Sequence, residues 1–224
     1  MMDRSALAKM IDHTLLKPEA TNSDVIALCS EAVELGTFSV CVSPTFVSLA
    51  AANVSNGVKV ATVCGFPSGK HEAEIKAAEA KLSVAQGANE VDMVIDVGRA
   101  IMGDWHYLEA EVSAVRSATT GALLKVILET AALTDEQIAK ACIRCESAGA
   151  DFVKTATGFH PAGGADVRAI QIMHETVGGR LGIKASGGIR DIEFATELIN
   201  AGATRLGLSS SRAILDGVTA TGSY

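Results

Sequence analysis

The chain has 224 residues, enough for one domain with a large core, and it is 48% apolar with only 4% aromatic residues. A composition dominated by Ala, Val, Ile and Leu favours helices packed on a buried parallel sheet over an aromatic-rich sandwich. The net charge of −7, spread without long runs of one sign, argues against nucleic acid or an anionic membrane as the main partner, because both recruit basic patches.

Helix and strand signals alternate along the whole chain. Short caps such as Thr21 and Thr134 precede the helical stretches, and glycines such as Gly36 and Gly149 follow them. In chain order we expect helix 5–10, strand 11–14, helix 21–35, strand 38–43, helix 44–53, strand 58–64, helix 70–86, strand 90–95, helix 98–118, strand 123–129, helix 134–149, strand 151–155, helix 165–177, strand 181–185, helix 190–200, strand 204–208 and a short helix after 209–211.

The strand count depends on residues 11–14, which give eight strands if they are admitted and seven if they are not. Eight βα repeats without a linker predict an α/β fold of the (β/α)8 TIM-barrel type, one domain over residues 1–224 with a short N-terminal helix. A doubly wound open sheet is the alternative, and it predicts a GxGxxG motif after an early strand. The sequence contains no such motif.

The sequence also bears on the cellular compartment and on the cysteines. No run of eighteen apolar residues appears, and the first five residues lack the layout of a signal peptide, so we expect a cytoplasmic protein. Five cysteines, an odd number, indicate reduced thiols rather than a disulfide framework. Cys142 and Cys145 form a CxxC on a predicted helix, but no second pair completes a zinc site, and we expect no metal.

A lysine inside an apolar strand, Lys154, is the most informative residue of the sequence. In a barrel, functional groups stand at the carboxyl ends of the strands, and Lys154 and Lys184 occupy such positions on adjacent strands. Neighbouring strands lie roughly 5 Å apart, so two ammonium groups there repel each other and one pKa falls, which leaves an amine nucleophile. Asp92, on the same inner surface, can hold the second lysine charged or move protons.

Other polar residues at strand ends admit more than one interpretation. A single strand lysine more often reaches out to solvent than acts as a nucleophile, whereas several lysines with an aspartate on inner faces are harder to explain in that way. Lys125 can belong to the site or merely pair with an acid. The polar residues at predicted strand ends are Asp12, Cys41, Asp92, Lys125, Lys154 and Lys184.

The loops after the last two strands predict a phosphate site, because barrels of this type often bind phosphate there. These loops carry Ser186-Gly187-Gly188 and Gly207-Leu208-Ser209-Ser210-Ser211, and Gly158 follows Lys154. Glycine lets backbone amides approach an anion and serine adds a hydroxyl donor. Each loop alone could equally be an ordinary turn. His160 is read as a loop residue.

Seven motifs, in this order and spacing, resemble the deoxyribose-phosphate aldolases, and the resemblance spans nearly the whole chain. The motifs are IDHTLLKP from Ile11, VCVSP from Val40, VCGFP from Val63, EVDMV from Glu90, KVILE from Lys125, FVKTATGF from Phe152 and IKASGG from Ile183.

The resemblance implies a cofactor-independent, class I aldolase that cleaves 2-deoxy-D-ribose 5-phosphate into glyceraldehyde 3-phosphate and acetaldehyde. It implies Lys154 as the Schiff-base lysine, Lys184 as the neighbour that lowers its pKa and Asp92 as the proton relay. It further implies a homodimer and a C-terminal tail whose last residue, Tyr224, assists proton transfer. The implied substrate-binding residues are Asp12, Thr14, Cys41, Lys125, Thr157, Gly158, Gly187, Gly188, Gly207, Ser209 and Ser210.

Two other functions compete with this one. A different Schiff-base barrel would share the lysine and the phosphate loops but act on another phosphosugar. A non-catalytic barrel that senses a sugar phosphate would have no use for a second lysine that lowers the pKa of the first, so the paired lysines favour an enzyme.

Overall fold

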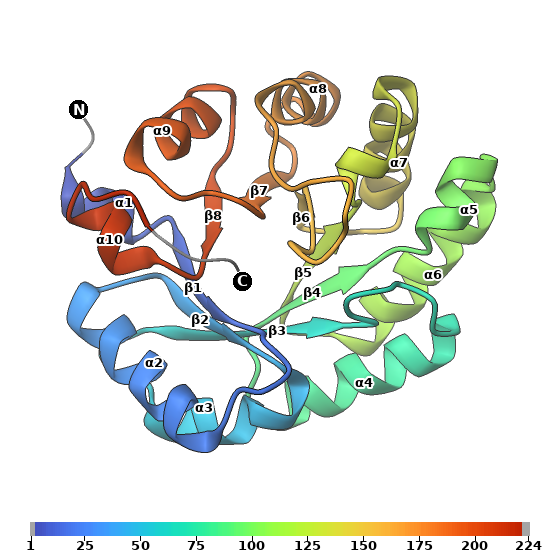
Figure 1. Cartoon of the computed structure of the whole chain (residues 1–224). Helices are drawn as coiled ribbons and strands as arrows, with labels where there is room; N and C mark the ends of the chain where they lie inside the picture. Colours follow the sequence, from blue (N-terminus) through green and yellow to red (C-terminus); the bar gives the residue numbers. More distant parts are fainter. Residues whose placement is uncertain (1–2, 221–224) are drawn as a thin grey trace.

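A computed structural model describes residues 3–220 and shows eight parallel strands that close into a barrel in chain order (Figure 1). The first strand pairs with the last, Asp12 opposite Gly207, so the eight-strand prediction is confirmed and the open sheet is wrong. The strands are β1 Ile11–Leu15, β2 Ser39–Val42, β3 Lys59–Cys64, β4 Glu90–Val94, β5 Leu123–Ile127, β6 Phe152–Lys154, β7 Gly182–Ser186 and β8 Arg205–Leu208.

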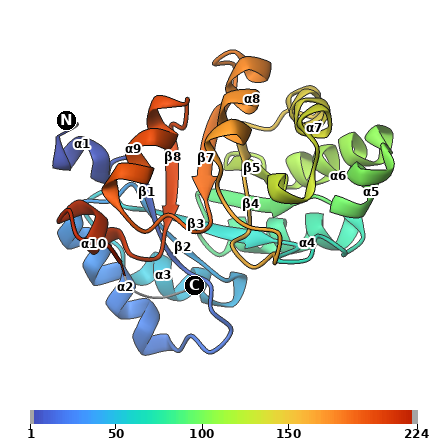
Figure 2. The same ribbon diagram turned by 45° about the horizontal axis from the view of Figure 1, so that its top comes forward.

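Helices surround the barrel on its outer side (Figure 2). The short N-terminal helix packs beside the last helix, where Arg4 and Asp216 form an ion pair of 2.9 Å. The helices are α1 Arg4–Ala8, α2 Asn22–Leu35, α3 Val47–Asn53, α4 Ala73–Ala85, α5 Val97–Met102, α6 Trp105–Ala118, α7 Asp135–Ser147, α8 Val167–Val177, α9 Ile192–Asn200 and α10 Ser211–Leu215, with 3-10 turns η1 Pro44–Phe46 and η2 Thr130–Ala132.

The predicted helix over 98–118 is two helices. Gly103 ends α5 in the left-handed region, with a φ of 76° that glycine adopts without steric cost, and the Asp104 side chain then accepts a hydrogen bond from the backbone N–H of Tyr107 at the start of α6. The stretch after Pro44 likewise begins as a 3-10 turn before α3. These breaks change no strand and leave the barrel as predicted.

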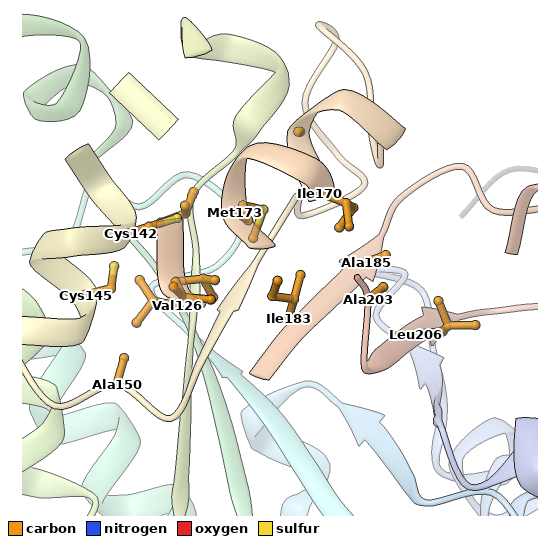
Figure 3. Close-up of a cluster of buried hydrophobic side chains, with 14 of the residues drawn as sticks. Val126, Cys142, Cys145, Ala150, Ile170, Met173, Ile183, Ala185, Ala203 and Leu206 are labelled. Carbon is orange, nitrogen blue, oxygen red and sulfur yellow. The ribbon is translucent and has the colours of Figure 1, made fainter. Parts of the chain in front are cut away.

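Apolar side chains of β5 to β8 pack against α7 and α8 in a buried layer between the barrel and its helices (Figure 3). Val126 and Ile183 project from the strands toward Met173 of α8. Cys142 and Cys145 are buried in this layer, and burial raises the pKa of Cys142 to about 12. Within residues 3–220, no group of three or more His, Cys, Asp or Glu side chains could hold a metal ion.

The helices of residues 3–220 are also too short or too polar for a bilayer. None of them combines the length and the apolar character that a membrane-spanning segment requires.

Candidate active site

The barrel interior contains a cluster of charged side chains that point inward from different strands. Alternation along each strand places them on the inner face, and their fractional exposures do not exceed 3%. Charges at such depth persist only when they are paired and hydrogen-bonded. The cluster contains Asp12 from β1, Asp92 from β4, Lys125 from β5, Lys154 from β6 and Lys184 from β7.

Lys154 and Lys184 are register partners on adjacent strands, as predicted. One carboxylate oxygen joins them, because Asp92 Oδ2 accepts hydrogen bonds from Lys154 Nζ at 2.8 Å and from Lys184 Nζ at 2.7 Å. Lys184 also donates to Asp12 Oδ2 at 2.5 Å. Among residues 3–220, Lys184 thus has two carboxylate partners, whereas Lys154 has Asp92 alone within ion-pair distance.

This difference in partners separates the two lysines electrostatically. Burial lowers the pKa of Lys154, the Asp92 carboxylate opposes that effect, and the positive charge of Lys184 adds to it, so the pKa lies below its ordinary value. Burial also acts to lower the pKa of Lys184, but Asp12 and Asp92 together outweigh it and hold that pKa well above its ordinary value. The predicted repulsion is present, although burial is the larger cause.

Lys125 lies in the middle of β5 and does pair with acids. Its Nζ contacts Asp92 Oδ1 at 2.8 Å and Glu90 Oε2 at 2.6 Å. Burial opposes a higher pKa, but Asp92 and Asp12 outweigh it and raise the pKa of Lys125. The pairing with acids is thus confirmed, and the partners include the central carboxylate of the cluster. A part for Lys125 in substrate binding stays a prediction.

Thr14 and Cys41 lie within the strands predicted for them, and their part in substrate binding stays a prediction. They are register partners on β1 and β2, and both are buried. The Thr14 hydroxyl donates to the carbonyl of Asp12 at 2.8 Å, and burial raises the pKa of the Cys41 thiol. Neither Thr14 nor Cys41 adds a charge to this part of the barrel wall, where the charged side chains are those of the lysine and aspartate cluster.

Thr157 has a partner that the sequence reasoning did not select. Its hydroxyl donates to Glu129 Oε2 at 2.6 Å, and its N–H donates to Glu129 Oε1 at 3.2 Å. Glu129 is buried at the end of the loop after β5 and adopts a left-handed φ of 57°. A buried acid thus fixes the loop that follows Lys154.

A pocket of about 230 Å³ lies at the loops predicted to bind phosphate. His160, read as a loop residue, lies in its wall. Four further lining residues were not predicted from the sequence, Gly163, Gly164, Ile189 and Arg190. The signal that could have identified Arg190 is an arginine two residues after Gly188, since arginine commonly pairs with phosphate. The pocket is lined by Gly158, His160, Gly163, Gly164, Gly187, Gly188, Ile189, Arg190, Ser209 and Ser210.

Gly207 is not in the wall of this pocket. A Cβ atom there would lie 2.9 Å from Ser186 Cβ and 3.0 Å from Lys184 Cε, so the glycine makes room for the Lys184 side chain. The absence of a side chain at Gly207 thus allows Lys184 to reach the cluster, and a contact between Gly207 and the anion stays a prediction.

A buried histidine, His13, contacts the serine loop that follows β8. His13 Nδ1 lies 2.8 Å from Ser211 Oγ, and His13 Nε2 lies 3.1 Å from Glu31 Oε2. The hydrogen bond with His13 and the pairing with Arg212 outweigh burial and lower the pKa of Glu31 to about 2. This chain of contacts connects Ser211, the residue after Ser210, to β1 and α2. Tyr224 lies outside the described residues.

Changing Gly187 to alanine is expected to weaken binding of inorganic phosphate by about tenfold, equivalent to about 1.4 kcal/mol. The Cβ atom would stand 2.9 Å from Gly164 Cα and 3.4 Å from Gly158 Cα, so it would push apart segments that line the pocket. Gly188→Ala is the control, because Gly188 also has a positive φ but open space around its Cβ position. Titration calorimetry measures both, and equal losses would contradict the steric explanation.

Comparison with known proteins adds independent information. The family described as DeoC/LacD family aldolase matches residues 6–217. The deoxyribose-phosphate aldolase of Corynebacterium diphtheriae is 62% identical over 217 residues, 96% of this chain and 98% of the relative, and that of Kocuria rhizophila is 58% identical over 219 residues, 97% and 99%.

Solved structures agree with these relatives. The aldolase QR15 superposes with a TM-score of 0.89 at 38% identity, covering 93% of this chain and 94% of that one. The tetrameric deoxyribose phosphate aldolase of Aeropyrum pernix superposes with a TM-score of 0.85 at 33% identity, covering 96% and 91%.

Proposed function

The chain belongs to the DeoC/LacD family of aldolases, and on that premise we propose that it reversibly cleaves 2-deoxy-D-ribose 5-phosphate to D-glyceraldehyde 3-phosphate and acetaldehyde. Relatives with 56–62% identity over nearly the whole chain carry the name of that activity. The observation that carries the proposal is the Lys154 amine, buried, with a lowered pKa, beside a bridging carboxylate.

The proposed chemistry begins at Lys154 Nζ. The unprotonated amine attacks the aldehyde carbon of the open-chain sugar, and loss of water gives an iminium ion. The bond between the second and third sugar carbons then breaks, its electron pair moves into the iminium to form an enamine, and the third-carbon hydroxyl loses its proton to form the aldehyde of glyceraldehyde 3-phosphate. Protonation of the enamine and hydrolysis release acetaldehyde and regenerate the amine.

Asp92 and Lys184 have distinct proposed roles in these steps. Asp92 Oδ2 lies 2.8 Å from Lys154 Nζ, within reach for passing protons directly or through one water. Lys184 stays positively charged through Asp12 and Asp92, and that charge disfavours a second ammonium at Lys154. Thr14 and Cys41 provide uncharged wall beside the reacting carbons.

The phosphate group has its proposed place in the glycine and serine pocket. Backbone amides next to Gly187 and Gly188, the hydroxyls of Ser209 and Ser210 and the guanidinium of Arg190 together offer donors and positive charge. The pocket follows β6, β7 and β8, the strands that carry or adjoin Lys154 and Lys184. Binding phosphate there would fix the sugar so that its aldehyde end extends toward Lys154.

We further propose one catalytic domain over residues 1–224, a homodimer, a cytoplasmic location and a role in deoxyribonucleoside breakdown. Tyr224 is proposed to assist proton transfer from the C-terminal tail. The A. pernix relative is tetrameric by its description, so the assembly of this chain calls for a direct mass measurement.

Reductive trapping tests the central step. Incubation with acetaldehyde or deoxyribose 5-phosphate and then borohydride is expected to place the adduct on Lys154, mapped by peptide mass spectrometry. Lys125 and Lys184 are internal controls, because their carboxylate partners raise their pKa values and they should stay unmodified. An adduct elsewhere, or none, would overturn the proposal, and efficient trapping only with another phosphosugar would favour the rival Schiff-base barrel.

A further inference from the structure

Two buried charges lie beneath the lysine cluster and were not selected from the sequence, Glu90 and Arg205. Each is the first residue of its strand, β4 and β8, and each lies two positions before a cluster residue or Gly207 on the same inner face. Arg205 Nη1 contacts Glu90 Oε2 at 3.1 Å and Asp12 Oδ1 at 2.7 Å. They form a lower tier of the same interior.

Two chains of ion pairs connect this lower tier to Lys154. One passes from Glu90 through Lys125, at 2.6 Å, to Asp92 Oδ1, at 2.8 Å. The other passes from Arg205 through Asp12 and Lys184 to Asp92 Oδ2. Both end on the carboxylate that contacts Lys154 Nζ, so a charge lost from the lower tier alters the field at that amine.

Aromatic rings close the lower tier off from water. The guanidinium of Arg205 lies 3.6 Å from the ring centre of Phe38 and 5.4 Å from that of Phe152. The Phe152 ring occupies the space where a side chain at position 182 would begin, because a Cβ on Gly182 would lie 2.2 Å from its edge. Ions in such surroundings are screened weakly, and an unmatched charge is costly.

The formal charges of the buried cluster determine which protonation state of Lys154 makes the cluster neutral. Among the described residues, the ion-paired cluster that contains Lys154 has three carboxylates and, apart from Lys154, three cations, so this cluster is neutral only when the Lys154 amine is unprotonated. Glu129 is buried outside this cluster, where it accepts from Thr157. Cys41, which faces Lys154 from β2, adds no charge, because burial raises its pKa. The carboxylates are Asp12, Glu90 and Asp92, and the cations are Lys125, Lys184 and Arg205.

We propose that Glu90 and Arg205 are positioning residues that set the charge balance of the barrel interior and thereby decide whether Lys154 is protonated at neutral pH. This inference rests on the proposed role of Lys154 as the reactive amine. It predicts that removing Glu90 and removing Arg205 change the protonation of Lys154 in opposite directions, although both residues are buried and each contacts the other. If the two residues only supported the fold, both substitutions would change trapping at Lys154 in the same direction.

The experiment compares Arg205→Met with Glu90→Gln. Removing the guanidinium leaves an excess negative charge, so the Lys154 ammonium becomes more stable and the fraction trapped by acetaldehyde and borohydride at neutral pH falls by about tenfold, the change expected for one pKa unit. Removing the carboxylate has the opposite sign, and the acid limb of the trapping profile moves to lower pH. The double variant restores the original net charge and should return the profile toward that of the unchanged protein.

Arg205→Lys is the matched control, because it disturbs the packing against Phe38 but keeps the charge, and its profile should stay near the original. Titration of the Lys154 side chain by NMR, in protein with isotope-labelled lysine, reads the same protonation without catalysis. Shifts of the same sign in both single variants, or a shift in Arg205→Lys as large as in Arg205→Met, would overturn the inference. An unchanged protein that never traps at Lys154 would instead overturn the proposed function.

Discussion

Replacing Lys154 with leucine is expected to lower kcat for deoxyribose 5-phosphate cleavage by roughly 10⁴-fold or more, the scale seen when a covalent nucleophile is removed. Leucine has no atom that can form the iminium, and the carbanion left by carbon–carbon cleavage would have no electron sink. An assay that consumes the released glyceraldehyde 3-phosphate measures the loss.

The fold should survive this change. Asp92 keeps its contacts with Lys125 and Lys184, so no carboxylate is left without a cation, and leucine fills much of the apolar volume of the lysine stem. Inorganic phosphate should bind as before, because Lys154 does not line the phosphate pocket. Retained cleavage, or trapping that moves to Lys184 with nearly full activity, would remove Lys154 from the mechanism.

The barrel could be predicted because each βα unit carries its own local signals, a short apolar strand and then a capped helix. The first strand was the uncertain one, since three consecutive polar residues, Asp12, His13 and Thr14, contradict an apolar strand pattern. Their partners explain the contradiction. Asp12 pairs with Lys184 and Arg205, which lie 172 and 193 residues away in the chain, and no local window contains them.

The buried positions of Lys154 and Lys184 could be predicted for a related reason. Lys154 and Lys184 interrupt apolar strands at positions that alternation places inside a barrel, so the anomaly itself is visible in the sequence. Glu90 and Arg205 give no such signal, because each begins a strand, where a charged residue commonly faces solvent. These two ions are placed in the interior only by the pairing of β1 with β8 and by the packing of Arg205 against the Phe38 ring.

The glycine and serine pocket, where phosphate is proposed to bind, could be predicted in part. The glycine and serine loops after β7 and β8 are recognisable by composition, and four of their predicted residues line it. Gly163 and Gly164 come from a separate loop, and a Cβ atom at Gly164 would lie 2.3 Å from the carbonyl oxygen of Gly187. Such an approach between two loops of different βα units depends on the closed barrel and leaves no local trace in the sequence.

A second large effect is expected outside the barrel, at the buried ion pair between α4 and α6. Lys76 Nζ lies 2.6 Å from Glu111 Oε2 and donates to the carbonyl oxygen of Val94 at 2.9 Å, and both side chains are buried. Glu111 Oε1 accepts from the N–H of Asp96 at 2.8 Å. The pair thus fixes the chain just beyond β4.

Lys76→Met is expected to lower the free energy of unfolding by about 3–5 kcal/mol, because it leaves the Glu111 carboxylate buried without a cation. Lys76→Met combined with Glu111→Gln should recover much of that loss, since the amide oxygen can still accept from Asp96 and no charge remains. Lys140→Met, which breaks an exposed pair with Glu136, is the matched control and should change nothing measurable. Urea denaturation followed by the fluorescence of Trp105, the only tryptophan, measures all three.

The pH dependence identifies the cause of the loss. Burial raises the pKa of Glu111 in the unchanged protein, although Lys76 opposes this effect, so removing Lys76 raises that pKa further. A carboxyl group with a raised pKa binds its proton more tightly in the folded state, and stability therefore falls as the pH rises through the raised pKa. The difference in free energy of unfolding between Lys76→Met and the unchanged protein should accordingly become smaller as the pH is lowered toward the ordinary carboxyl range, where Glu111 becomes neutral. A deficit that is the same at every pH would mean that lost packing around the Lys76 stem, rather than the unpaired charge, destabilises the variant.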